Sequence, residues 1–155
     1  MIPTIAPEAR LVIERILPAD RDTVFRCWTD PEHLARWFGP TPGHCTPIAE
    51  VDLRVGGRYR IGMRKGADGK TQIVGGVYQE ISPEKLVFTW AWETSMPPSQ
   101  PPDETLVTIE FHELGDQTRV VLIHERFPHV QMRDQHGEGW NGCLDRLVCF
   151  VSNES

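Results

Sequence analysis

The chain of 155 residues contains no long apolar segment, because its hydrophobic runs extend over only a few residues. A helix needs roughly 20 apolar residues to cross a bilayer, so a membrane-spanning helix is excluded. The opening residues, Met-Ile-Pro-Thr, lack the basic stretch and apolar core of a secretion signal. We therefore expect a cytoplasmic protein with no membrane partner.

Positive charge and phosphate-binding motifs are also scarce. Sixteen Lys and Arg residues against 22 Asp and Glu residues give a formal net charge of -6, whereas proteins that bind nucleic-acid backbones concentrate positive charge. The sequence has no GxxxxGK loop and no GxSxG nucleophile elbow. It therefore predicts no nucleic-acid partner and no nucleotide cofactor, and it gives little support for nucleophilic catalysis.

Cysteine occurs without a recognisable pattern. The four cysteines, Cys27, Cys45, Cys143 and Cys149, include no CxxC pair. The neighbouring His44 and Cys45 stand in a stretch rich in proline and glycine, with no second pair at metal-ligand spacing. A chain of this length folds without disulfides. We expect free thiols, no metal site and no cofactor.

The composition is that of one compact domain. Hydrophobic residues make up 39% of the chain and charged residues 25%, which is enough apolar material for one core. The sequence shows no linker, internal repeat or low-complexity tract. We expect a single domain over residues 1–155.

The first part of the chain changes from a strand pattern to a helix pattern. Residues 11–17 are apolar and rich in β-branched side chains, as in a strand. Asp20 is placed to cap one short helix, and Asp30-Pro31 supplies a cap and an N1 proline for a second. The second helix is predicted to present one apolar face formed by Leu34, Trp37 and Phe38.

From residue 48 to residue 125 the sequence alternates with the period of β-strands. Strands are expected over about 48–55, 58–64, 71–81, 86–92, 105–113 and 118–125. The short connections require antiparallel neighbours. Gly75 and Gly76 indicate a bulge or a sharp bend, and the proline-rich residues 95–103 are expected to form a loop.

The C-terminal stretch returns to helical period. Its apolar stripe consists of Trp140, Cys143, Leu144, Leu147, Val148 and Val151. Gly137, Gly139 and Gly142 indicate close backbone approach or a thin helix face near its start. The expected fold is α+β: one strand, two short helices, six strands and a long helix, with a curved antiparallel sheet of about seven strands closed over that helix.

Several segments, taken in order, resemble one known superfamily. They are Trp28–Leu34, Trp37–Pro40, Val55–Arg60, Gly76–Pro83, Leu86–Trp90, Thr118–Glu125, and Gly139-Trp140 with Leu144–Leu147. Together they resemble the START-like (SRPBCC) superfamily, in particular bacterial single-domain proteins like the activator of the ninety-kilodalton heat-shock protein ATPase. The resemblance covers about residues 10–152 and implies the helix-grip (START/Bet v-like) fold.

The resemblance leaves three functions open. The first is non-enzymatic binding of a small hydrophobic or aromatic molecule in a cavity between the sheet and the C-terminal helix. The second is an enzyme like the polyketide cyclases and dehydratases, and the third is an interaction module like the chaperone-ATPase activator. Since one fold hosts many functions, the site has to decide between them.

A ligand cavity is compatible with the 13 aromatic residues of the chain, because such cavities are mostly apolar and aromatic. We expect the ligand-binding residues to be Trp37, Phe38, Tyr59, Tyr78, Trp90, Trp92, His124, Trp140 and Leu144. Tyr78 and His124 are the predicted polar groups that orient the ligand. No catalytic residue is assigned.

The enzyme alternative needs a buried group that moves a proton, and His124, Tyr78 and Glu80 are its candidates. His124 also fits a core histidine that is hydrogen-bonded to a neighbour. Tyr78 and Glu80 share a strand face in this pattern, and such a pair serves equally well as a structural hydrogen bond.

The remaining polar side chains of the strands point to a solvated surface. His112 is expected to be exposed, and Arg58, Arg60 and Arg64 alternate along one face that we expect to be the outer one. Exposed strand edges are compatible with a homodimer.

Overall fold

The structure is a computed structural model that describes residues 10–39, 41, 43–66, 69–93, 104–128 and 130–153. It begins with strand β1 (Leu11–Leu17) and helices α1 (Arg21–Thr29) and α2 (Pro31–Trp37). The strands that follow are β2 (His44–Val51), β3 (Arg58–Lys65), β4 (Gln72–Ser82), β5 (Lys85–Trp92), β6 (Thr105–Leu114) and β7 (Gln117–Glu125). Helix α3 (Val130–Asn153) follows the last strand.

Both short helices begin at the aspartates that the sequence indicates. The side chain of Asp20 accepts a hydrogen bond from the Thr23 amide at 3.1 Å, and that of Asp30 accepts one from the Glu32 amide at 2.9 Å. These bonds satisfy amide groups that have no partner inside the first helical turn. Pro31 opens α2, where a missing amide hydrogen costs nothing.

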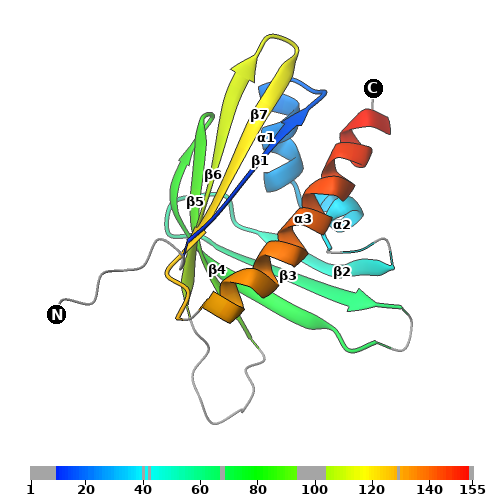
Figure 1. Ribbon diagram of the computed structural model, residues 1–155, viewed down its shortest axis with the longest axis vertical. Coiled ribbons are helices and arrows are strands. Elements are labelled where there is room, and N and C mark those ends of the chain that lie inside the picture. Colours follow the sequence, from blue (N-terminus) through cyan, green and yellow to red (C-terminus); the bar gives the residue numbers. More distant parts are fainter. Residues whose placement is uncertain are drawn as a thin grey trace, which may run out of the picture.

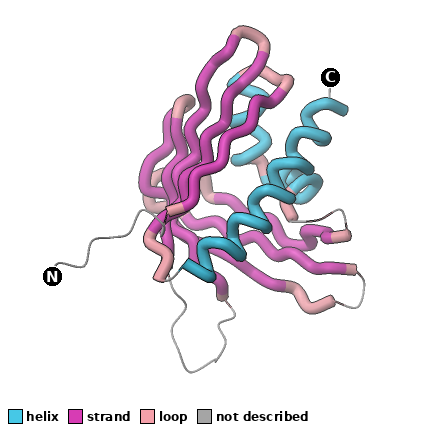
Figure 2. Tube along the Cα trace, in the orientation of Figure 1, coloured by secondary structure: helices cyan, strands magenta, loops and turns pink. Residues whose placement is uncertain are grey.

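The seven strands form one antiparallel sheet in the order β1-β7-β6-β5-β4-β3-β2. The sheet is strongly bent, and α3 crosses its concave side between the half formed by β5, β6, β7 and β1 and the half formed by β2, β3 and β4 (Figure 1). All three helices lie in the angle between these two halves (Figure 2). This arrangement confirms the predicted helix-grip fold.

The core fills the space between the concave face of the sheet and the helices. Alternate residues of each strand point inward, for example Tyr59, Ile61 and Met63 of β3, which are 4–6% exposed. The predicted stripe of α3 packs against them, with Leu144 and Leu147 fully buried. All four cysteines carry thiols rather than disulfides.

The strand expected over residues 48–55 is displaced. Strand β2 begins four residues earlier, at His44, and ends at Val51. Beyond it the chain folds into a tight turn in which the Gly57 amide donates to Arg54 O at 2.8 Å, and Gly56 adopts a φ of 87°. Leu53 and Val55 therefore lie on the surface, 42% and 66% exposed, although their spacing continues the strand pattern.

A bulge or a sharp bend was expected at Gly75 and Gly76, and the bulge lies elsewhere. The register of β4 against β5 shifts between Tyr78 and Glu80 instead. The two glycines serve close approach, because a Cβ atom on Gly76 would lie 2.0 Å from Thr89 O. The expected loop over residues 95–103 lies outside the described residues.

Candidate functional site

The strands β3, β4 and β5 and the helix α3 enclose a partly open cavity of about 230 Å³. Its lining residues are Phe38, His44, Met63, Gln72, Trp90, Trp92, Gln135, His136, Gly139, Trp140 and Cys143. The sheet supplies Met63, Gln72, Trp90 and Trp92, and α3 supplies the last five residues. Phe38 is the C-cap of α2 and His44 begins β2, so residues from the sheet and from two of the helices line the cavity.

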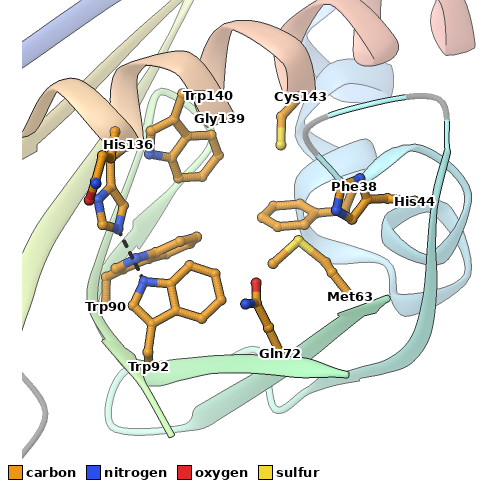
Figure 3. Close-up of a pocket in the computed structure, with 11 residues that line it drawn as sticks. Phe38, His44, Met63, Gln72, Trp90, Trp92, His136, Gly139, Trp140 and Cys143 are labelled. Atoms are coloured by element: carbon orange, nitrogen blue, oxygen red, sulfur yellow. Dashed lines mark hydrogen bonds between the residues drawn. The ribbon is translucent and has the colours of Figure 1, made fainter. Parts of the chain in front are cut away.

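The walls of the cavity are mainly aromatic. Figure 3 shows Trp90 and Trp92 on one side, Phe38 and Met63 on the opposite side, and Trp140 on the helix above. The Trp90 ring lies 5.0 Å from that of Trp140 and 5.7 Å from that of Trp92, measured between centroids. The absence of a side chain at Gly139 keeps the helix wall thin at this point. Such a surface favours a flat apolar molecule.

One side of the cavity depends on the segment between α2 and β2. The Phe38 carbonyl accepts hydrogen bonds from Thr46 Oγ1 at 2.5 Å and from Arg146 Nη1 of α3 at 3.4 Å. Arg146 Nη1 also donates to Thr41 O at 3.1 Å. The guanidinium occupies space that a side chain at Gly39 would fill, since a Cβ atom there would lie 2.4 Å from Nη1. These contacts tie Phe38 to the helix that forms the opposite wall.

His136 and Trp92 join the sheet to the helix at the cavity. Trp92 Nε1 donates to His136 Nε2 at 3.1 Å, and His136 Nδ1 lies 2.9 Å from Met132 O (Figure 3). A carbonyl oxygen can only accept, so Nδ1 carries the proton and the imidazole is neutral. Burial lowers the pKa of His136 in agreement with this state.

His124 is fully buried behind the cavity wall. Its Nδ1 accepts from Trp140 Nε1 at 3.0 Å, so its proton resides on Nε2, which lies 2.6 Å from Thr105 Oγ1. Thr105 Oγ1 donates in turn to Trp90 O at 3.2 Å. Burial, with a smaller effect of His136, lowers the pKa of His124 to about 2. Both ring nitrogens are therefore occupied, and the residue positions Trp140 rather than facing the cavity.

The nine residues predicted to bind a ligand fall into three groups. The cavity is lined by Phe38, Trp90, Trp92 and Trp140. Tyr59 and Tyr78 line a second space of about 20 Å³, enough for one water molecule, which shares Phe38 and Trp90 with the cavity. Trp37, His124 and Leu144 are almost fully buried and line neither space. Sequence periodicity finds the inward face of an element, but it does not say which inward residues border a gap.

Tyr78 and Glu80 do not form the expected pair. The register shift between them turns Tyr78 inward and leaves Glu80 exposed, where its carboxylate lies 3.9 Å from Lys85 Nζ. Burial raises the pKa of Tyr78 above its usual value, and burial, with a smaller effect of Tyr78, raises the pKa of Tyr59 well above its usual value. Tyr78 and Glu80 therefore do not support the acid-base alternative.

The surface predictions agree with the structure for His112, Arg58 and Arg60, whereas Arg64 is partly buried. The side chain of His112 is 45% exposed and pairs with Glu110 at 2.9 Å. Arg60 lies on the outer face, where it forms a bidentate pair with Glu93 at 2.6 and 3.0 Å. This pairing raises the pKa of Arg60 and lowers that of Glu93, mainly through the hydrogen bonds.

Sequence reasoning missed the polar rim of the cavity, namely His44, Gln72, Gln135 and His136. His136 carries a usable signal, because its offsets of four and seven residues from Trp140 and Cys143 place it on the same helix stripe. His44 stands in a stretch rich in proline and glycine, before the strand expected over 48–55, and the structure makes it the first residue of β2. Gln72 and Gln135 are exposed polar residues at the mouth, and no periodicity distinguishes them.

A bent antiparallel sheet closed by a C-terminal helix, with an aromatic cavity between them, defines a protein of the helix-grip class. Residues 18–152 match the family described as Activator of Hsp90 ATPase homolog 1-like protein, and the chain belongs to this family. This result confirms the resemblance drawn from the sequence motifs.

Solved structures of bacterial proteins share the fold. A protein from Chromobacterium violaceum is 27% identical, with a TM-score of 0.81 and coverage of 92% of this chain and 96% of that one. The AHSA1 protein from Silicibacter pomeroyi is 24% identical, with a TM-score of 0.81 and coverage of 95% and 100%. An AHSA1-like protein from Aeromonas hydrophila is 25% identical, with a TM-score of 0.76 and coverage of 94% and 93%. Comparison with curated proteins gives no match.

Two further observations concern the described residues alone. No helix among them combines the length and the apolar character needed to cross a membrane. Within the same ranges, no three His, Cys, Asp or Glu side chains gather as metal ligands would.

Proposed function

We propose that this protein binds a small, flat aromatic molecule in the cavity between the sheet and α3, without chemically changing it. The observation that carries the proposal is the aromatic cavity itself, which is bordered by Trp90, Trp92, Trp140 and Phe38. Apolar walls with a few polar groups at the rim are the usual features of small-molecule sites.

The volume of the cavity limits the size of the ligand. An apolar cavity of about 150 Å³ accommodates benzene, and sites for drug-sized molecules span about 300–1,000 Å³. The present cavity, at about 230 Å³, lies between these values. It therefore suits a molecule of one or two rings and does not enclose a long-chain lipid or a tetracyclic polyketide.

The polar groups around the cavity favour binding over proton transfer. His136 and His124 are neutral, and each ring nitrogen already has a partner. Burial raises the pKa of the Cys143 thiol to about 12, so it is not a thiolate nucleophile at neutral pH. These groups shape and orient the cavity walls.

The indole groups provide a test with an internal control. In 1H–15N NMR spectra, titration with 2-naphthol should shift the indole signals of Trp92 and Trp140. The indole of Trp37 should not move, because it is buried and donates to Cys27 O at 2.9 Å away from the cavity. The proposal fails if no cavity indole responds at millimolar 2-naphthol.

A cavity-filling variant tests the location. Gly139→Leu places a side chain in the cavity, so it should abolish binding while the protein stays folded, since leucine also favours the helix by about 1 kcal/mol. Glu138→Leu is the matched control, because position 138 is exposed on the same helix. Equal binding by Gly139→Leu and the wild type would contradict the proposed site. Alanine at Trp90 or Trp140 is a poorer test, because removing a buried tryptophan costs about 3–5 kcal/mol of stability.

A further inference from the structure

The rim of the cavity differs from its interior in electrostatic character. None of the residues that line the cavity is an aspartate or glutamate, within the described part of the chain. Two cationic side chains, Lys65 and Arg146, stand close to the His44 side of the rim. Any charged group on a ligand therefore meets positive charge there.

The sheet register places Lys65 at the rim. Lys65 pairs directly with His44 across β2 and β3, and residues directly opposite each other project on the same face. Lys65 also follows Met63 by two residues, so it shares the inward face of β3 with a lining residue. Lys65 is exposed, and none of the ion pairs between described residues includes it, which leaves its charge available.

Arg146 approaches the same side from the helix. Its Nη1 donates to Thr41 O at 3.1 Å, and Thr41 Oγ1 lies 2.8 Å from His44 Nδ1. The Nδ1 atom of His44 is thus engaged, and Nε2 is the ring nitrogen left for a ligand. Burial first, and then the charges of Lys65 and Arg146, lower the pKa of His44. The cations therefore act on this part of the rim.

Neutral hydrogen-bonding groups complete the rim. The amide of Gln72, which pairs with Met63 across β3 and β4, points into the space between Trp92 and Met63 (Figure 3). An amide group donates two hydrogen bonds and accepts others, so it suits an oxygen-bearing substituent on an aromatic ring.

We infer that the ligand is an aromatic carboxylate of one or two rings, with its ring against Trp92 and Phe38 and its carboxylate toward His44 and Lys65. This inference rests on the proposed function and adds the charge of the ligand. A carboxylate gains from both cations and meets no lining carboxylate, whereas a neutral molecule of the same shape gains only the apolar contacts.

A matched pair of probes tests the inference. 2-Naphthoate and 2-naphthamide have nearly the same shape and differ in charge, and their dissociation constants follow from the shifts of the Trp92 and Trp140 indole signals. We expect 2-naphthoate to bind at least about threefold more tightly at low salt. Raising the NaCl concentration from 50 to 300 mM should reduce the difference between the two dissociation constants, because added ions screen exposed charges.

A charge-removing variant locates the effect. Lys65→Gln should raise the dissociation constant of 2-naphthoate about two- to fivefold, which is the range expected for the loss of an exposed ion pair. It should leave the dissociation constant of 2-naphthamide unchanged. Lys85→Gln is the control, because it removes the same charge at the start of β5, where Lys85 faces Glu80 rather than the cavity.

The outcomes separate the two proposals. If 2-naphthamide binds as tightly as 2-naphthoate, or if Lys65→Gln weakens both equally, the carboxylate inference is overturned and the aromatic site stands. The inference is also overturned if 2-naphthoate binds without moving the cavity indoles. If neither probe nor 2-naphthol binds, the proposed function fails as well.

Discussion

The stability of this protein should fall sharply in mild acid because of one buried histidine. His124 is fully buried, accepts from Trp140 and lies 2.6 Å from Thr105 Oγ1, and its pKa in the folded state is about 2 against an ordinary value of 6.5. The unfolded chain binds a proton near pH 6.5 and the folded chain does not. The stabilisation is therefore complete above pH 6.5 and is lost as the pH falls from 6.5 toward 2.

The size of the loss follows from the proton taken up on unfolding. At pH 5 the unfolded histidine lies 1.5 pH units below its ordinary pKa of 6.5, which corresponds to about 2 kcal/mol at 1.36 kcal/mol per unit. This figure hardly depends on the folded value, provided that value stays well below 5. A loss of this size is a large fraction of the stability of a typical domain.

Urea unfolding followed by tryptophan fluorescence at pH 8 and pH 5 measures this loss. His124→Gln keeps one donor and one acceptor but cannot ionise, so it should lose about 2 kcal/mol less than the wild type between the two pH values. His112→Gln, at an exposed position, controls for loss of a histidine as such. Equal losses in wild type and His124→Gln would refute the reasoning. If His124→Gln does not fold, the imidazole 15N chemical shifts of the wild type provide the test. A protonated His124 in the folded protein at pH 5 would also refute the reasoning.

Three further predictions use the same structure. Both tyrosine hydroxyls have raised pKa values, so absorbance at 295 nm should show no tyrosinate in the folded protein at pH 11. The free energy of unfolding should fall as the pH rises above 10, because only the unfolded chain then loses these protons. Tyrosinate absorbance from folded protein below pH 11 would contradict the burial of the two side chains. Gly76→Ala should lower the free energy of unfolding, measured with urea, by about 2–4 kcal/mol, because its Cβ atom would collide with Thr89 O. Gly43→Ala should leave the free energy of unfolding nearly unchanged, because the nearest atom to its Cβ lies at 3.7 Å. Similar losses in the two variants would refute the close approach at Gly76. A thiol reagent at pH 8 should modify the exposed Cys45 and Cys149 quickly, and the buried Cys27 and Cys143 only after unfolding. Peptide mass spectrometry identifies the modified residues, and rapid modification of Cys143 would contradict its burial in the cavity wall.

Local chemistry made most of the fold predictable. Asp20, Asp30 and Pro31 determine where the short helices begin, because capping involves only neighbours in the chain. Strand alternation identified the inward faces, and Tyr59, Ile61, Met63, Leu86, Phe88 and Trp90 are buried as expected. Short connections also predicted the antiparallel pairing of consecutive strands, whereas the pairing of β1 with the distant β7 came only from the structure.

Predictions failed where a residue depends on a distant segment. Val55 continues the strand pattern, but a turn closed by Gly57 and the contact of Gly56 with Tyr78 O divert the chain. Glu80 follows Tyr78 by two residues, and yet a shift in pairing with β5 turns its side chain outward. Alternation presumes an unbroken register, and the register is set by the partner strand.

The candidate site shows more clearly which features follow from the sequence and which depend on the tertiary structure. The sequence by itself determined that a helix and a sheet would face each other with many aromatic side chains between them. Only the tertiary structure decided that Trp90, Trp92 and Trp140 border a gap while Trp37 is packed, because a gap is a volume left by several elements at once. It also decided that His124 faces Trp140 and Thr105, since hydrogen bonds between residues 16 and 19 positions apart exist only in the folded chain.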